Sequence, residues 1–160
     1  MADRDRDPSG RARNARPRDA AGRPLPRDTA GVPRVSEDLA LTPAEALAEA
    51  NRLLATGTPF AAHEVLEAAW KTAPPAERAL WQGLAQLAVG LTHAQRGNAT
   101  GAVRLLRRGR ARIEPYAAGP PYGVAVDRLV AAAGSLASRL ETAGLDDLDE
   151  DDLRLRLTGP

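Results

Sequence analysis

A stretch of seventeen residues without a charged side chain, from Ala79 to Gln95, constrains the fold of this chain most strongly. It reads ALWQGLAQLAVGLTHAQ, and its strongly polar side chains are Gln82, Gln86, Thr92, His93 and Gln95. A helix this free of charge normally lies inside a protein with other helices around it. It is also too short and too polar to cross a bilayer. We therefore expect this stretch to form a central helix of a folded domain.

Composition favours helices and excludes several kinds of site. Alanine, leucine and arginine dominate the chain, and aromatic residues make up only 3% of it, which argues against a sheet. There is no cysteine, so disulfides, thiolate metal sites and thiol nucleophiles are excluded. The N-terminal residues carry acids and lack an apolar segment, unlike a signal or transit peptide. We expect a soluble, cytoplasmic, all-α protein.

The balance of charge and apolar residues divides the chain into three parts. Residues 1–36 hold nine arginines against five aspartates and little to bury, which predicts a disordered Arg/Pro/Gly-rich arm. Residues 37–144 carry the apolar spacing of a helical domain. Residues 145–160 hold six acids against Arg154 and Arg156, and we expect an acidic C-terminal tail with room for a short helix.

Local signals predict where the first two helices begin and end. Thr42 is followed by a proline and by Glu45, which is the pattern of a capping box with proline at the first helical position. Gly57 should end this helix. Thr58, again before a proline, should cap a second helix that ends before Pro74.

Three further helices follow from the same kind of signal. The third should run from about Ala76 to Arg96 and end at a glycine. Asn98 should cap the fourth, which reaches about Ile113. After a loop rich in tyrosine, glycine and proline, Asp127 should cap the fifth.

An internal repeat at an offset of 40 residues joins these helices into pairs. The segment beginning at Gly57 aligns with the segment beginning at Gly97, and Pro75 falls opposite Pro115. Each unit has a helix, a glycine turn, a second helix and a proline stop, which is similar to tetratricopeptide-type helix pairs. We predict a compact bundle of antiparallel helix hairpins with about five helices.

Polar side chains of the second and third helices form the candidate site. At 100° per residue, His63 and Glu67 share one stripe at the edge of the second helix's apolar face. Gln82, Gln86 and His93 share one face of the third helix. Because an unpaired buried polar group costs about 1–3 kcal/mol, we expect these groups to meet in a largely dry crevice.

Three interpretations of this cluster compete. In the first, a hydrogen-bond network ties the helices together and does no chemistry. In the second, His63 and Glu67 bind a divalent metal at their i, i+4 spacing, with His93 as third ligand. The zincin pattern would need a second histidine at position 67. In the third, Glu67 tunes His63 as a general acid or base, although no nucleophile or oxyanion turn accompanies the pair.

A run of arginines marks the fourth helix. We interpret it as a solvated face near the C-terminal end of the helix, where cations suit the helix dipole. The alternative is a phosphate- or nucleic-acid-binding stripe, which the lack of adjacent aromatic residues disfavours. The residues are Arg104, Arg107, Arg108, Arg110 and Arg112.

The spacing of the polar positions is similar to a known pattern. The chain reads Phe60-x-x-His63-Glu64-x-x-Glu67-x-x-Trp70, then Gln82-Gly83-Leu84-x-Gln86-x-Ala88, His93, and Gly97-Asn98-x-x-Gly101-Ala102-x-x-Leu105-Leu106. Over residues 43–130 this resembles domain-of-unknown-function family 309. The resemblance implies an all-α bundle, found in prokaryotic proteins, with no established activity. The polar positions that match are His63, Glu64, Glu67, Gln82, Gln86, His93 and Asn98.

The helix-pair repeat and the lack of a catalytic set favour a non-enzymatic module that binds a protein partner or a second copy of itself. The rival is a metal-assisted hydrolase or small-ligand binder centred on His63, Glu67 and His93. We expect no contact with membranes, no nucleic acid, and no cofactor beyond the divalent metal of the rival.

Overall fold

The computed structural model describes residues 40–159, so the arm predicted over residues 1–36 lies outside the described residues. The described part contains five α-helices and no strand, which confirms the all-α prediction. The helices are α1 (Pro43–Ala55), α2 (Pro59–Thr72), α3 (Arg78–Gln95), α4 (Ala99–Ile113) and α5 (Val126–Ala143). Three short 3-10 helices are η1 (Glu114–Tyr116), η2 (Pro121–Gly123) and η3 (Asp151–Leu153).

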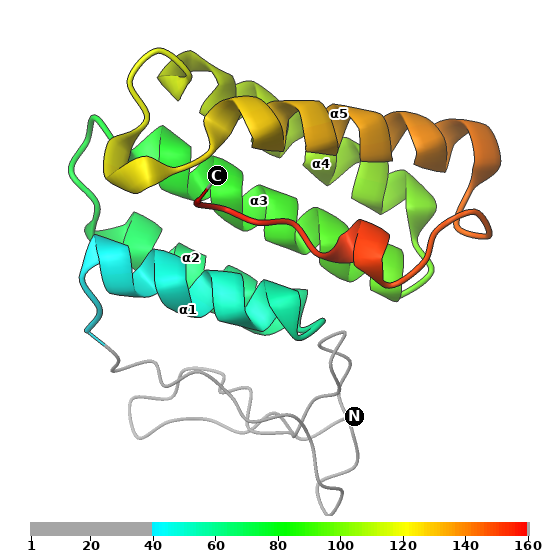
Figure 1. Ribbon diagram of the computed structural model, residues 1–160, viewed down its shortest axis with the longest axis horizontal. Helices are drawn as coiled ribbons and strands as arrows, with labels where there is room; N and C mark the ends of the chain where they lie inside the picture. Colours follow the sequence, from blue (N-terminus) through cyan, green and yellow to red (C-terminus); the bar gives the residue numbers. More distant parts are fainter. Residues whose placement is uncertain (1–39, 160) are drawn as a thin grey trace, which may run out of the picture.

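Helices that are adjacent in the chain pack against each other in antiparallel pairs. Helices α2, α3 and α4 form one layer, and α1 and α5 lie on the same side of it (Figure 1). The C-terminal segment crosses α3 in the space between α1 and α5 (Figure 1). The fold is therefore two layers, with α3 at the centre.

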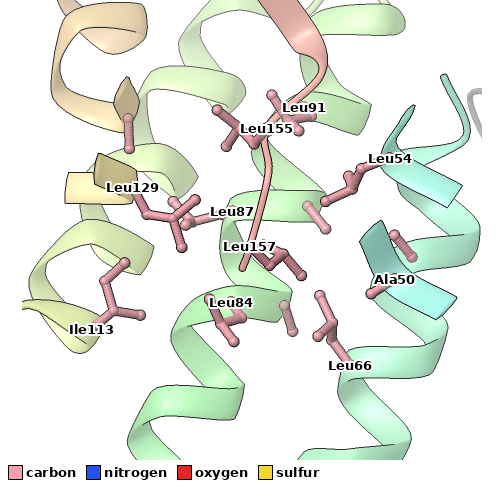
Figure 2. Close-up of a cluster of buried hydrophobic side chains, with 14 of the residues drawn as sticks. Ala50, Leu54, Leu66, Leu84, Leu87, Leu91, Ile113, Leu129, Leu155 and Leu157 are labelled. Carbon is pink, nitrogen blue, oxygen red and sulfur yellow. The ribbon is translucent and has the colours of Figure 1, made fainter. Parts of the chain in front are cut away.

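Leucines of α3 form the middle of the core, as the uncharged stretch predicts. Leu80, Leu84, Leu87 and Leu91 are at most 1% exposed. Leucines from the other helices surround them, and Figure 2 shows several of these side chains converging. They include Leu47, Leu54, Leu66, Leu106 and Leu129.

The ends of the helices confirm most of the start and stop signals read from the sequence. Gly57 and Gly97 have φ of 75° and 81°, a conformation that glycine adopts without steric cost and that commonly ends helices. Thr42 and Glu45 exchange the two hydrogen bonds of a capping box, at 3.2 and 3.0 Å. The Asn98 side chain accepts a bond from the Gly101 amide at 2.9 Å.

One predicted cap stands at the right residue but makes no capping hydrogen bond, and another is wrong. Thr58 stands at the N-cap of α2, but its hydroxyl donates to the Leu53 carbonyl at 2.8 Å and caps no amide. Asp127 lies inside the first turn of α5, which begins at Val126. The start of α5 is set by a distant contact, because the Ala125 amide donates to the Leu157 carbonyl at 2.8 Å.

Residues 154–159, which we call the C-terminal strap, run in extended form after η3. Leu155 and Leu157 are 9% and 1% exposed and belong to the core (Figure 2). Arg139 of α5 holds the preceding acidic turn through Asp152, at 2.7 Å, and this contact lowers the Asp152 pKa to about 2. The boundary drawn at residue 145 thus marks a change of charge and not an edge of the core.

Candidate functional site

Two contacts fix how α2 and α3 lie against each other. The Gln95 side chain donates to the Gly57 carbonyl at 2.9 Å, and the Arg96 guanidinium lies 5.6 Å from the centroid of the Phe60 ring. The start of α2 therefore lies beside the end of α3, and we call the contact line between the two helices the α2–α3 seam.

His63, Glu67 and Lys71 form a row along α2 beside this seam. The Glu67 carboxylate lies 3.0 Å from His63 Nε2 and 3.6 Å from Lys71 Nζ. A carboxylate oxygen only accepts hydrogen bonds, so Nε2 of the neutral ring carries the proton and donates it. His63 Nδ1 is left as a buried acceptor without a hydrogen-bond partner among residues 40–159.

Burial lowers the pKa of His63. The Glu67 carboxylate and the Phe60 carbonyl both favour the charged ring, but the loss of hydration outweighs them. The His63 side chain is 23% exposed, and that of Glu67 is 37% exposed. The pair is therefore a neutral imidazole and a carboxylate at the edge of solvent.

The polar side chains of α3 fall into two groups, one along the helix and one at its C-terminal end. Gln82 and Gln86 are half-buried, and Gln86 Oε1 is a buried acceptor that no described residue satisfies. His93 Nδ1 lies 3.2 Å from the Asn98 side-chain amide, in the turn to α4. Burial lowers the His93 pKa, and the nearby charges of Arg96 and Arg104 lower it further.

The structure thus places the predicted residues in two groups. His63 and Glu67 lie at the α2–α3 seam, whereas His93 and Asn98 lie at the α3–α4 turn. Over the described range, no three His, Asp or Glu side chains are grouped closely enough to hold a metal ion. His63, Glu67 and His93 are therefore not brought together as one set of ligands. Glu64 is half-buried on the second turn of α2.

The arginines of α4 also divide into two sets. Arg107 makes a two-bond ion pair with Glu141 of α5, at 2.5 and 2.6 Å, and Arg110 donates to the Val130 carbonyl at 3.2 Å. Arg104, Arg108 and Arg112 form no salt bridge with another described residue and are exposed. Two arginines tie α4 to α5, and three follow the exposed face at four-residue intervals.

Sequence reasoning missed the residues that hold the C-terminal strap. Asn51 Oδ1 accepts from the Leu157 amide at 2.7 Å, and Arg128 donates to three strap carbonyls. One signal was available, since Leu153, Leu155 and Leu157 alternate with arginines in the period of an extended segment.

This fold and site define an all-α helix-hairpin domain with a polar seam. Residues 47–105, from α1 into α4, match the family model described as Domain of unknown function (DUF309), which confirms the resemblance drawn from the motifs. They include all seven polar positions named above.

One relative is the "Uncharacterized protein YpuF" of Bacillus subtilis (strain 168), which is 49% identical over 53 residues. The aligned segment covers 32% of this chain and 30% of that protein, so the chain matches less than a third of the relative's length. No solved structure matches the chain. Within residues 40–159, no helix has both the length and the apolar character to span a membrane.

Proposed function

We propose that this chain is a cytoplasmic, non-enzymatic interaction module that binds a second copy of itself. The surface is the outer face of the α2–α3–α4 layer, turned away from α1, α5 and the C-terminal strap. The proposal rests on the half-burial of Phe60, Trp70 and Leu105, which helical spacing places toward this face. Beneath it, His63 Nδ1 and Gln86 Oε1 are buried without a hydrogen-bond partner among the described residues. Aromatic residues are enriched at protein–protein interfaces relative to the rest of a protein surface.

The two edges of the outer face carry opposite charge. Helical spacing places Glu64, Glu67 and Lys71 on the α2 edge, two acids against one base, and Arg104 and Arg108 on the α4 edge. A two-fold axis parallel to α3, lying between two such faces, sets α2 of each copy over α4 of the other. Acidic and basic edges then meet twice, as a self-complementary interface requires.

The outer face is comparable in size to one side of a standard dimer interface. Three helices about 9 Å apart and about 20 Å long present roughly 600 Å² of flat area. A standard interface buries about 800 Å² of accessible surface on each partner. Nearly the whole face is therefore needed, so a change on either edge should weaken the dimer.

Sedimentation velocity of the full chain over a hundredfold range of concentration tests the proposal. We expect the mass to rise from one chain to two. Glu64→Arg and Arg104→Glu should each weaken the dimer at least tenfold. The double variant should restore it, because these two positions face each other across the two-fold axis and exchange charge. Arg156→Glu, on the opposite side of the layer, is the control. A monomer at all concentrations, or single variants that behave as the wild-type chain, would contradict the proposal.

The rival proposal, a metal-assisted hydrolase or small-ligand binder, is favoured by one observation, the unpaired Nδ1 of His63 beside Glu67. Elemental analysis of untagged protein tests it. Metal near one equivalent that disappears in His63→Ala would support the rival, and metal at background in both proteins would exclude it.

A further inference from the structure

The C-terminal strap runs between α1 and α5 and crosses α3 (Figure 1). We call the space that the strap fills between these three helices the groove. The strap is extended, so successive side chains point to opposite sides. Leu155 and Leu157 are buried among leucines of these helices (Figure 2), whereas Arg154 and Arg156, which alternate with them, are exposed.

Most of the hydrogen bonds that hold the strap are made to its main chain. From α1, Asn51 Oδ1 accepts from the Leu157 amide at 2.7 Å, and its amide nitrogen donates to the Thr158 hydroxyl at 2.6 Å. Before α5, the Ala125 amide donates to the Leu157 carbonyl at 2.8 Å. Arg128 of α5 donates to the carbonyls of Arg156, Thr158 and Gly159 at 3.1–3.2 Å.

Such contacts depend little on which side chains the bound segment carries. Main-chain hydrogen bonds to an extended segment supply affinity, and pockets for alternate side chains supply specificity. Here the pockets take the side chains of Leu155 and Leu157, and the intervening positions face solvent.

The strap is joined to the rest of the molecule by a polar turn. Gly144, with φ of 68°, ends α5, and the acidic turn that follows is held by a part-buried, two-bond ion pair of Arg139 with Asp152. Its other ion pairs, of Arg139 with Asp147 and of Arg154 with Asp151, are exposed. Exposed ion pairs contribute little to stability. The helix-to-helix contacts, from α1–α2 through α4–α5, are made without the strap.

We propose that this groove is a binding site for extended peptides with leucines at alternate positions, and that the C-terminal strap is its resident occupant. The partner is a segment of another protein of the form Leu-x-Leu with polar residues between. This site is separate from the outer face. A tethered segment acts at an effective concentration of about millimolar, so a partner binds well only when the strap is weakened.

Fluorescence anisotropy of a labelled synthetic peptide with the sequence of residues 151–159 tests the proposal. The full chain with Leu157→Ser, which releases the strap, should bind this peptide at least tenfold more tightly than the wild-type chain does. A peptide with serine in place of the leucine at position 157 should not bind. Adding Asn51→Ala to the released chain should weaken binding about tenfold. A released chain with a native circular dichroism spectrum and no affinity for the peptide would overturn the proposal.

A second measurement needs no variant. In the wild-type chain, the amides of Ala125 and Leu157 should exchange with deuterium through local opening, faster than the amide of Leu84 in α3. Equal protection at these positions would mean that the strap leaves only when the whole molecule unfolds, and it would overturn the proposal even if Leu157→Ser does not fold.

Discussion

At the scale of single residues, two glycines bring the backbones of α3 and α4 into contact. A Cβ atom at Gly109 would lie 2.7 Å from the Gly83 carbonyl oxygen, and one at Gly83 would lie 3.0 Å from that of Gly109. Backbone atoms cannot move aside as a flexible side chain can. The close pairing of these helices therefore depends on the absence of side chains at both positions.

We expect Gly109→Ala to lower the free energy of unfolding by about 1–3 kcal/mol, because the new methyl group forces the helices apart. Urea denaturation measures this. The matched control is Gly134→Ala in α5, whose Cβ would approach only the Arg110 side chain, at 3.3 Å. The control should be neutral or stabilise by up to about 1 kcal/mol. Equal effects of the two substitutions would contradict the role of the glycine contact.

The two histidines should make stability depend on pH. The pKa of each is lowered in the folded chain, so at acidic pH the unfolded chain takes up protons first. Their contribution is complete above the ordinary histidine pKa of 6.5 and is lost as pH falls below that value. Because burial is the main cause at His63, His63→Gln should reduce the loss between about pH 7 and pH 5.

Urea unfolding at several pH values checks this expectation. His93→Gln is the comparison, and we expect a smaller reduction, since His93 is the less buried ring. A chain whose pH dependence is unchanged by His63→Gln would show that the ring is not desolvated as described.

At the scale of helices, the signals that predicted the fold correctly are local ones. Thr42 and Asn98 each bond to an amide three residues away, and Gly57 and Gly97 end their helices through their own backbone conformation. Such features can be found in sequence because all their atoms come from one short segment. The pairing of His63 with Glu67, at i, i+4, could be predicted for the same reason.

Features that join distant segments could not be found in this way. The start of α5 depends on Leu157, so the local acid at Asp127 gave the wrong cap. The helical spacing grouped His93 with His63 as one polar cluster. It could not show that the Asn98 side chain lies against His93 in the turn to α4. The strap was obscured by the acidic residues before it.

The two kinds of helix start can be compared directly. Thr42→Ala should lower the free energy of unfolding by about 1 kcal/mol, because it removes the acceptor of the α1 capping box. Asp127→Ala should cost about 0.3 kcal/mol, the size expected for an acid in the first turn that caps no amide. Thermal or urea unfolding distinguishes them, and equal losses would restore Asp127 as a cap.

At the scale of the whole molecule, the strap closes the core between α1 and α5. We expect Leu157→Ala to lower the free energy of unfolding by about 2–5 kcal/mol, because the side chain is 1% exposed and leaves a cavity. Arg156→Ala, one residue earlier and exposed, should change it by less than about 0.5 kcal/mol. Unfolding in urea measures both. A small effect of Leu157→Ala would mean that the core is complete without the strap.

The long reach of the strap bears on how the chain folds as it leaves the ribosome. Leu157 bonds to Asn51, 106 residues earlier. At about 5–20 residues per second, the ribosome needs roughly 5–20 s to make the intervening stretch. During that interval the leucines that the strap later covers are exposed on the nascent helices. A chaperone that binds apolar surfaces should bind the chain during this interval.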